Sequence, residues 1–422
     1  MTDRPPPPDR VVATPAMPLP WRYSGHAWRL GRRVTRRRLD LFLRARSAAA
    51  LPGARARFLA MGLPPDVVDG ALRLVRSVAG WPDAWTWAAQ RLLGEARQQA
   101  SAGHVWEAAD ARRCAALAYH AAELLAYDDP KKARALRASA TTLYAQAVPT
   151  LLPDAHRVDV RWRATRLPAY LLCPENLATP PPLAVLLNGA TTTKEELLAW
   201  RGRFLAHGLA VLTLDWPGTG EAAGVDRATA DCEDLTDGVL DVAAEHRLDA
   251  RRVALVGFSL GGALAVRAAA LDRRIAACVA VTPPYDARPW LGAATPLLFD
   301  QLAAFAGGPD RAAELAAQFA LPDVMVRMRC PLLVLGAGRD LVVPPGDAVR
   351  LAAAAGDLGT LVWFPDAAHG LYDRVDTWTD DAARWLSTVL GPYRPFPSTQ
   401  VDAAPRTEPA LAVRRSDGTG LG

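Results

Sequence analysis

The chain has 422 residues, of which half are hydrophobic, and its formal net charge at pH 7 is +5. This length is typical of two domains with a large core, and so small an excess of positive charge does not indicate a nucleic-acid-binding protein. The apolar runs are short and interrupted by charged residues, so the sequence predicts no membrane-spanning helix.

Composition also bears on the cellular compartment. Nearly all basic residues are arginines, and alanine, glycine and proline are abundant, which indicates a GC-rich bacterial genome. The five cysteines are scattered and form no CxxC pair, a pattern that predicts reduced thiols rather than disulfides or a metal site. A twin-arginine-like run at 36–38 is followed by Asp40 and Arg44, which interrupt the apolar segment of an export signal. We therefore expect a cytoplasmic protein without a bound metal.

The N-terminal third of the chain divides into a tail and a helical region. Residues 1–26 are rich in proline, and we expect a disordered tail there. Over 27–152, Ala, Leu and Trp recur at helical spacing, and breaks occur at places such as Pro64-Pro65 and Pro130. This pattern predicts an all-α N-terminal domain of about five or six helices.

Near Pro153 the pattern changes to short apolar runs that alternate with helical segments. The expected strands are 158–162, 167–173, 183–187, 209–214, 253–256, 275–281, 332–335 and 361–364. The expected helices are 194–207, 229–246, 260–270, 346–355 and 376–390. This alternation predicts an α/β catalytic domain at 153–391, with a mostly parallel sheet and helices on both faces. A helical insertion at about 283–328 either roofs an active site or only packs there, and 392–422 has the composition of a second disordered tail.

A G-x-S-x-G motif at 257–261 lies between an expected strand and an expected helix. In this context the motif exposes the hydroxyl of its serine, Ser259, on a tight turn, and the flanking glycines let strand and helix approach closely. The N-terminus of the following helix favours negative charge. Ser259 is therefore the candidate nucleophile.

A serine nucleophile needs a base and an acid that orients the base; after such a turn the acid precedes the histidine in the chain. His369 is the only histidine after Ser259, and it lies just beyond an expected strand. Asp340 also follows a strand, so it lies at the same edge of the sheet. Asp347 and Asp366 are alternatives, but the first belongs to the next helix and the second is too close to His369 in sequence. We predict a triad of Ser259, Asp340 and His369.

Two backbone N–H groups are expected to form an oxyanion hole. One belongs to Leu260, immediately after the nucleophile, and the other to the loop after strand 183–187. Within this loop we favour Ala190, with Gly189 and Thr191 as alternatives. A further loop at 215–221 is expected to have a structural role at the rim of the site.

Together these stretches resemble one branch of the α/β hydrolases, whose members carry a helical N-terminal domain. The branch includes fermentation-respiration switch proteins, 2,6-dihydroxypseudooxynicotine hydrolases and fungal pigment chain-shortening hydrolases. The matching segments are 188–196, 215–221, 257–262 and 340–344, together with His369. The resemblance covers about residues 60–390. It implies the α/β-hydrolase fold, catalysis without a cofactor, and a homodimer.

The resemblance also implies hydrolysis of a carbon–carbon bond beside a carbonyl in an aromatic or polyketide-like small molecule, or of an ester. Some carbon–carbon hydrolases of the branch have an additional Glu after the strand that follows the nucleophile, and the stretch 282–290 has none. Asp286 is the candidate replacement. We expect the apolar part of the substrate to pack against Trp290, Phe299 and Phe305, between the helical domain and the catalytic core.

Other interpretations are weighed against this one. The alternatives are a general carboxylesterase or thioesterase, a non-catalytic binding protein on a hydrolase scaffold, and a cyclase or lyase that uses the same pocket without adding water. Tyr119 and His120, on an apolar helix, either face the pocket or, as is more common, lie on a helix surface or at a domain interface.

Overall fold

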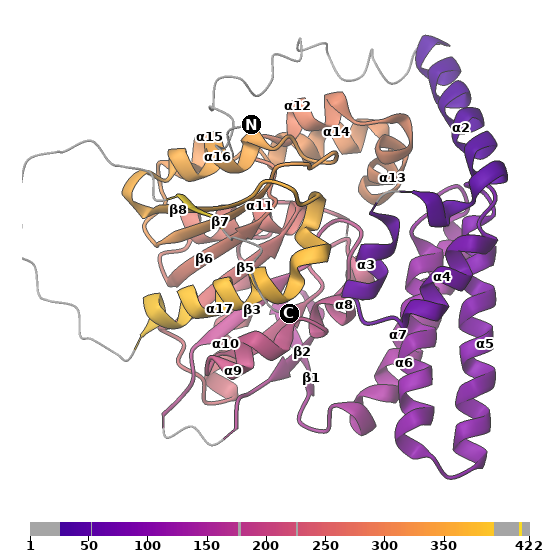
Figure 1. The fold of residues 1–422 in the computed structure, drawn as a ribbon. Helices are drawn as coiled ribbons and strands as arrows, with labels where there is room; N and C mark the ends of the chain where they lie inside the picture. The colour runs from indigo at the N-terminus through magenta and orange to yellow at the C-terminus, as the bar shows by residue number, and fades with distance from the viewer. Residues whose placement is uncertain (1–25, 52, 176–178, 225–226, 392–412, 416–422) are drawn as a thin grey trace, which may run out of the picture.

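The computed structural model describes residues 26–51, 53–175, 179–224, 227–391 and 413–415. A helical N-terminal part lies beside a central sheet (Figure 1). The two expected tails fall outside the described residues, apart from His26 and Val413–Arg415. The latter forms a short strand, β9, where a tail was expected. Its three residues pair with the edge strand of the sheet, and so short a pairing leaves no periodic pattern in the sequence.

Within the described residues the sheet has nine strands, in the order β1-β2-β4-β3-β5-β6-β7-β8-β9. Those before β9 are β1 His156–Trp162, β2 Thr165–Leu172, β3 Leu183–Leu187, β4 Ala210–Leu214, β5 Val253–Phe258, β6 Ile275–Val281, β7 Leu332–Ala337 and β8 Gly359–Phe364. β2 is antiparallel to β1 and β4, and all other neighbours are parallel. Every residue of β3 and β5 is buried, as expected for parallel strands covered on both faces. The predicted α/β fold class is confirmed.

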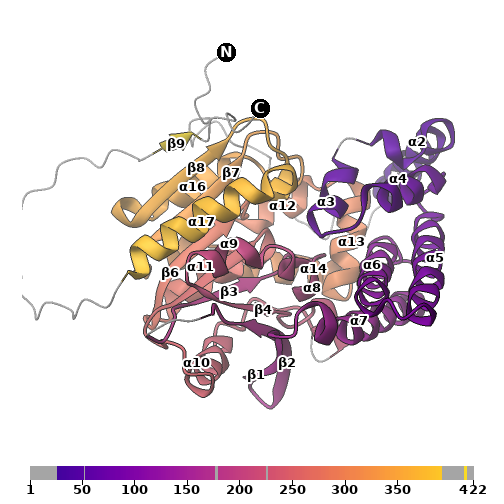
Figure 2. The same cartoon turned by 60° about the horizontal axis from the view of Figure 1, so that its bottom comes forward.

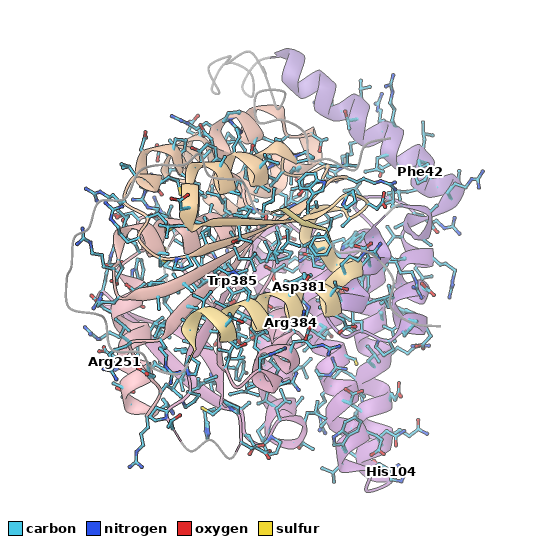
Figure 3. All side chains as sticks on the ribbon, turned by 60° about the vertical axis from the view of Figure 1, so that its left-hand side comes forward. Phe42, His104, Arg251, Asp381, Arg384 and Trp385 are labelled. Atoms are coloured by element: carbon cyan, nitrogen blue, oxygen red, sulfur yellow. The ribbon has the colours of Figure 1, made fainter. Side chains whose placement is uncertain are left out.

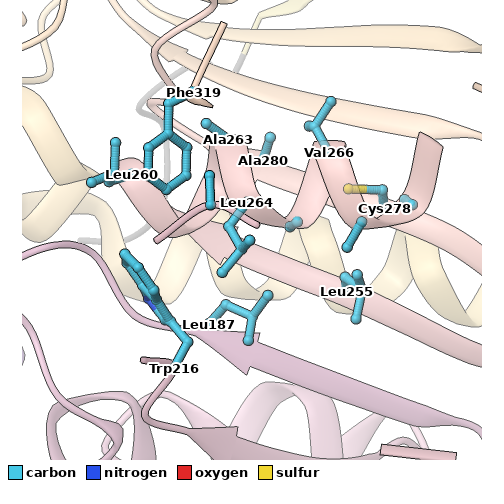
Figure 4. Close-up of a cluster of buried hydrophobic side chains, with 14 of the residues drawn as sticks. Leu187, Trp216, Leu255, Leu260, Ala263, Leu264, Val266, Cys278, Ala280 and Phe319 are labelled. Carbon is cyan, nitrogen blue, oxygen red and sulfur yellow. The ribbon is translucent and has the colours of Figure 1, made fainter. Parts of the chain in front are cut away.

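Helices cover both faces of the sheet (Figure 2). One hydrophobic core includes α10 Leu235–Glu245, α11 Leu260–Leu271 and α16 Gly346–Ala354, and another includes α9 Arg201–Ala206 and α17 Val375–Leu390. In the first core, Leu260 and Leu264 of α11 belong to the same cluster as Leu187, Leu255 and Trp216 (Figure 4). Burial of these side chains fixes α11, and the turn before it, on the central strands.

The N-terminal part contains six α-helices within the described residues, as the sequence pattern predicts. They are α2 His26–Arg46, α3 Ala54–Ala60, α4 Pro65–Leu74, α5 Trp81–Ser101, α6 Val105–Glu123 and α7 Pro130–Leu151. Proline occupies the first turn of α4, α5 and α7, where its missing N–H costs no hydrogen bond. α5 and α6 form a long hairpin with His104 at its tip, far from the sheet (Figure 3).

The connections around the sheet include two further groups of helices. Four lie between β6 and β7, at the position of the predicted insertion: α12 Ala287–Ala293, α13 Pro296–Ala306, α14 Pro309–Gln318 and α15 Pro322–Met325. α13 contacts α2, so the insertion touches the N-terminal part. The prediction of one helix over 194–207 is wrong, because α8 (Lys194–Leu198) ends before α9 begins. Ala199 and Trp200 donate hydrogen bonds to carbonyls three residues earlier, which closes α8 in a tight turn.

Candidate active site

Ser259 lies on the turn between β5 and α11, in a positive-φ conformation with φ 53° and ψ −120°. A residue other than glycine is strained there. The surrounding backbone leaves no space for larger neighbours. A Cβ on Gly257 would lie 2.1 Å from the carbonyl oxygen of Gly261, and a Cβ on Gly261 would lie 2.2 Å from that of Asn188. The glycines of the motif are thus required by the close crossing of strand, turn and helix.

Among the three residues predicted to form a triad, His369 lies within hydrogen-bond distance of both Ser259 and Asp340. His369 Nε2 is 3.0 Å from Ser259 Oγ, and His369 Nδ1 is 2.7 Å from Asp340 Oδ2. The other carboxylate oxygen of Asp340 accepts hydrogen bonds of 2.8 Å from the N–H groups of Val342 and Val343. These bonds hold the carboxylate, which in turn orients the histidine ring toward the serine hydroxyl. Such an arrangement can transfer the hydroxyl proton to the ring while the carboxylate stabilises the imidazolium.

All three residues follow the carboxyl ends of parallel strands β5, β7 and β8, which meet at one edge of the sheet. The alternative acids are engaged elsewhere. Asp347 forms an ion pair with Arg350 at 2.5 Å, and Asp366 forms one with Arg339 at 2.7 Å. The structure therefore brings neither alternative to His369.

The loop after β3 carries one of the candidate oxyanion donors. Gly189 packs against the nucleophile, because a Cβ placed on it would lie 3.3 Å from the Cβ of Ser259. Its own N–H already donates to the hydroxyl of Thr192 at 2.6 Å. The N–H of Ala190 donates to no other described residue, and Leu260 is the first residue of α11, so its N–H has no acceptor within the helix. Ala190 and Leu260 can therefore donate to a bound oxyanion.

The predicted substrate contacts do not gather at one place. A pocket of about 730 Å³ lies between the N-terminal helices, the loop after β3 and the insertion, and Ala190 and Phe305 line it. Trp290 and Phe299 belong instead to the hydrophobic core. Asp286 caps α12, because its carboxylate accepts the N–H of Arg288 at 3.0 Å and pairs with that guanidinium at 2.6 Å. These three residues are not part of the pocket lining.

Arg57 of α3 reaches from the N-terminal helices into the catalytic part. Its guanidinium donates to the carbonyl of Thr191 at 2.5 Å and to the hydroxyl of that residue at 3.1 Å. It also forms an ion pair of 3.1 Å with the buried Glu196. The same group lies 5.9 Å from the ring centroid of Tyr372, in the segment that begins at His369. Arg57 thus contacts both the loop beside the nucleophile and the segment that carries the candidate base.

His120 of α6 binds the same carboxylate, with its Nε2 2.5 Å from Glu196 Oε1. Burial opposes the charged ring, but Glu196 and Glu123 outweigh this effect and raise the pKa of His120 to about 9. Burial also opposes the ionised form of Glu196, yet the cations Arg57 and His120 hold the pKa of Glu196 below its ordinary value. His120 lines the pocket and joins the two parts of the molecule.

A second buried cluster fixes the start of α8. The ammonium of Lys194 lies 2.9 Å from carboxylate oxygens of Asp215 and Glu221 and 2.5 Å from one of Glu195. Burial opposes the charge of Lys194, but these carboxylates raise its pKa above the ordinary value. The cluster ties the loop 215–221 to α8, in keeping with the structural role expected for that loop.

Several other features bear on the chemistry. No group of three or more His, Cys, Asp or Glu side chains within the described residues could hold a metal ion. In the same part of the chain, no helix is long and apolar enough to cross a membrane. All five cysteines are free thiols, and only Cys173 is not fully buried.

Comparison with known proteins places the chain in a family. A family model described as "Alpha/beta hydrolase family" matches residues 184–413, and one described as "Esterase FrsA-like" matches residues 74–288. The chain belongs to the alpha/beta hydrolase family. The first match runs from β3 to the start of β9, and the second runs from the end of α4 to the start of α12, so it includes the N-terminal helices α5–α7 and the turn at Ser259.

This alpha/beta hydrolase has relatives that are themselves named hydrolases. It is 33% identical over 202 residues to the 2,6-dihydropseudooxynicotine hydrolase of Paenarthrobacter nicotinovorans, which covers 47% of this chain and 54% of that one. It is 32% identical over 269 residues to Hydrolase acrC of Aspergillus aculeatus, which covers 58% of this chain and 61% of that one. The chain thus spans less than two thirds of the length of these curated relatives. Their names describe hydrolases, and the family match places this chain in the family to which its fold also belongs.

Solved structures extend the comparison to the N-terminal helices of this alpha/beta hydrolase. The crystal structure of the 2,6-dihydroxy-pseudo-oxynicotine hydrolase is similar, with a TM-score of 0.69 and 27% identity over 79% of this chain and 95% of that one. So large a share of the chain includes helices that precede the sheet. AbyA5 is also similar, with a TM-score of 0.63 over 83% of this chain and 94% of that one; its identity of 21% supports the fold alone.

Proposed function

We propose that this hydrolase cleaves a carbonyl substrate through an acyl-enzyme, with Ser259 as nucleophile, His369 as base and Asp340 as the acid that orients the base. The observation that carries the proposal is the position of the His369 ring, which lies 3.0 Å from Ser259 Oγ and 2.7 Å from Asp340 Oδ2. The strained turn at Ser259 and the N–H groups of Leu260 and Ala190 also support it.

In the proposed mechanism, His369 takes the hydroxyl proton as Ser259 Oγ attacks the carbonyl carbon of the substrate. The N–H groups of Leu260 and Ala190 bind the resulting oxyanion. The bond to the leaving group then breaks, the leaving group takes the proton from His369, and an acyl group remains on Ser259. Water, which gives a proton to His369 as it attacks, releases the acid and restores the serine hydroxyl.

The variants Ser259→Ala and His369→Ala test this proposal. Each is expected to lower kcat by about 10³-fold or more while substrate still binds, because the members of such a triad act as a unit. A fluorophosphonate probe is expected to label the wild-type protein at Ser259 and to leave Ser259→Ala unlabelled. Near-wild-type turnover by both variants would show that the triad is wrongly assigned.

For the bond that is cleaved, we propose a carbon–carbon bond of an aromatic or polyketide-like ketone. The similarity to the 2,6-dihydropseudooxynicotine hydrolase supports this choice, because the resemblance to that branch implies hydrolysis of such a bond. Ester hydrolysis is a second candidate, and the position of Asp286 favours it. In either reaction His369 can protonate the leaving group. A carbanion or enolate is the more demanding leaving group, and the Asp286 carboxylate, the candidate second donor, is engaged by Arg288 at the start of α12.

Paired substrates separate the two candidates. We expect turnover of aryl β-diketones to exceed that of 4-nitrophenyl esters of graded chain length if a carbon–carbon bond is the natural target, and the reverse order for an esterase or thioesterase. Reaction in ¹⁸O-labelled water distinguishes both from a cyclase or lyase, because only hydrolysis adds the label to the product. We further propose a small-molecule substrate and a cytoplasmic location, which the five free thiols support.

A further inference from the structure

The pocket between the N-terminal helices and the catalytic part has the size of a small-molecule site, at about 730 Å³. Its walls come from α6 and α7, from the loops after β3 and β4, and from α13 and α14. Parts of the chain that are far apart in sequence therefore enclose it.

This pocket adjoins the nucleophile without containing it. Ala190 and Thr191 line the pocket, and the preceding residue, Gly189, packs directly against Ser259. Ser259 and His369 are not among the residues that line it. A substrate held in the pocket therefore extends across the loop after β3 to place its carbonyl at Ser259.

Arginine is the predominant charged residue in the described lining of the pocket. The lining contains four arginines, Arg134, Arg137, Arg227 and Arg311, and among the described residues the only carboxylate in it belongs to Glu123. That carboxylate forms an ion pair with Arg137. Among the described lining residues, arginines therefore outnumber carboxylates by four to one.

Part of this charge is engaged, because Arg137 and Arg311 form ion pairs and Arg227 also has an interaction of its own. Arg311 pairs with Glu314, which is exposed and outside the lining. Arg134 makes no ion pair with another described residue. His120, which also lines the pocket, is a further cation there, with a pKa raised to about 9 by its ion pair with Glu196. The Glu196 carboxylate beneath it is shared with Arg57.

We propose that this pocket binds the anionic end, a carboxylate or a phosphate, of the substrate whose carbonyl reacts at Ser259. Arginine recognises both groups through paired N–H donors, and the partly enclosed site strengthens the attraction. The inference rests on the proposed function and names its substrate class: an acidic acyl compound with its charge separated from the reacting carbonyl.

Matched esters test the substrate class. 4-Nitrophenyl hemiglutarate and 4-nitrophenyl pentanoate have the same acyl length but differ in a terminal carboxylate; 4-acetoxybenzoate and 4-acetoxybenzamide place the charge on the leaving group. We expect the anionic ester of at least one pair to have a kcat/KM about tenfold higher, mainly through a lower KM, and added salt to reduce the preference. A preference for the neutral ester in both pairs overturns the proposal.

Variants on α7 locate the effect in the pocket. Arg134→Gln is expected to lower kcat/KM for the preferred anionic ester about tenfold more than for its neutral counterpart. Lys131→Gln changes an exposed cation on the same helix that lies outside the lining, and it is expected to leave both esters unchanged. Equal losses for both esters in Arg134→Gln contradict the proposal. If Arg134→Gln does not fold by circular dichroism, Arg311→Gln replaces it.

Binding without turnover separates this inference from the proposed function. Calorimetric titration of the Ser259→Ala variant with monomethyl glutarate and with inorganic phosphate is expected to show saturable binding of at least one, and the tighter ligand identifies the anion. Absence of binding by both overturns the inference even if esters are hydrolysed. Loss of fluorophosphonate labelling together with retained anion binding would instead contradict the proposed function.

Discussion

At Ser259, the proposed nucleophilic role and steric packing both constrain the same short turn. The positive φ of this residue is unfavourable for any residue with a side chain. The crossing of β5, α11 and the loop after β3 holds it in place, and that crossing is possible only because Gly257 and Gly261 lack a Cβ. The residue types of the motif therefore follow from packing as much as from reactivity.

Asp340 is expected to act through His369. Asp340→Asn removes the charge but keeps the shape, so we expect kcat to fall by about 10³- to 10⁴-fold with little change in thermal stability. Asp366→Asn is the matched control, because this carboxylate lies three residues before His369 and pairs with the exposed Arg339. Steady-state kinetics check both variants, and a similar loss in each would argue against a special role of Asp340.

His120 is expected to make stability depend on pH. Its pKa is raised to about 9 in the folded protein, so its contribution is complete below the ordinary pKa near 6.5 and is lost as the pH rises through about 9. Between these values the free energy of unfolding should fall by up to about 1.4 kcal/mol per pH unit. Urea unfolding from pH 6 to pH 8 should show a smaller slope for His120→Gln than for the wild type. His104→Gln, at the exposed tip of the α5–α6 hairpin, should keep the wild-type slope.

At this scale, sequence predicts residues that belong to a motif and misses those that act through distant partners. Ser259, the histidine beside it and the aspartate beside that histidine could be predicted from one motif and from chain order. Arg57 could not, because it is one of many arginines and its partner Glu196 lies 139 positions away. The distribution of the aromatic residues between core and pocket also depends on tertiary packing that no local pattern specifies.

Among the elements, the seven-residue helix α3 is expected to affect catalysis through the side chain of Arg57. Arg57→Ala removes the hydrogen bonds to Thr191 beside the expected oxyanion donor and leaves the Glu196 carboxylate short of a cation. We expect kcat to fall about 10- to 100-fold with a smaller change in KM, because a misplaced donor affects the transition state more than the bound substrate.

The control for this prediction lies on the same helix. Arg55→Ala removes an exposed guanidinium that pairs with Asp69, and it should leave kcat unchanged. Arg57→Lys keeps the charge and should recover part of the activity if Arg57 positions the loop. A loss of stability without any change in kcat would identify a purely structural role for Arg57.

The central strands were accessible from sequence because burial on both faces makes them continuously apolar, as in β3 and β5. Elements that depend on contacts with other parts of the molecule could not be predicted from sequence. The break between α8 and α9 follows from tight turns at Ala199 and Trp200, and neither position is a proline or glycine that would have predicted it. β9 needs only a strand edge to pair with, which local sequence does not reveal.

For the molecule as a whole, the N-terminal helices and the sheet share a hydrophobic cluster, to which Trp85 of α5, Tyr170 and Leu172 of β2 and Leu198 of α8 contribute. We therefore expect the described parts to unfold in one transition. Trp85→Ala should lower the free energy of unfolding by about 3–5 kcal/mol. Activity and ellipticity should then be lost at the same, lower denaturant concentration. Trp87→Ala, half exposed on the same helix, should have little effect. Two separated transitions would show that the parts fold independently.

The ion cluster of Arg57, His120 and Glu196 limits how the helical and catalytic parts of related proteins can be exchanged. A chimera that joins the sheet of this chain to the helices of another protein would bury the Glu196 carboxylate without Arg57 and His120. An uncompensated buried charge of this kind typically costs about 3–5 kcal/mol. Engineers who exchange the helical part to change substrate preference should therefore transfer these three residues as one unit, or replace all three with uncharged side chains.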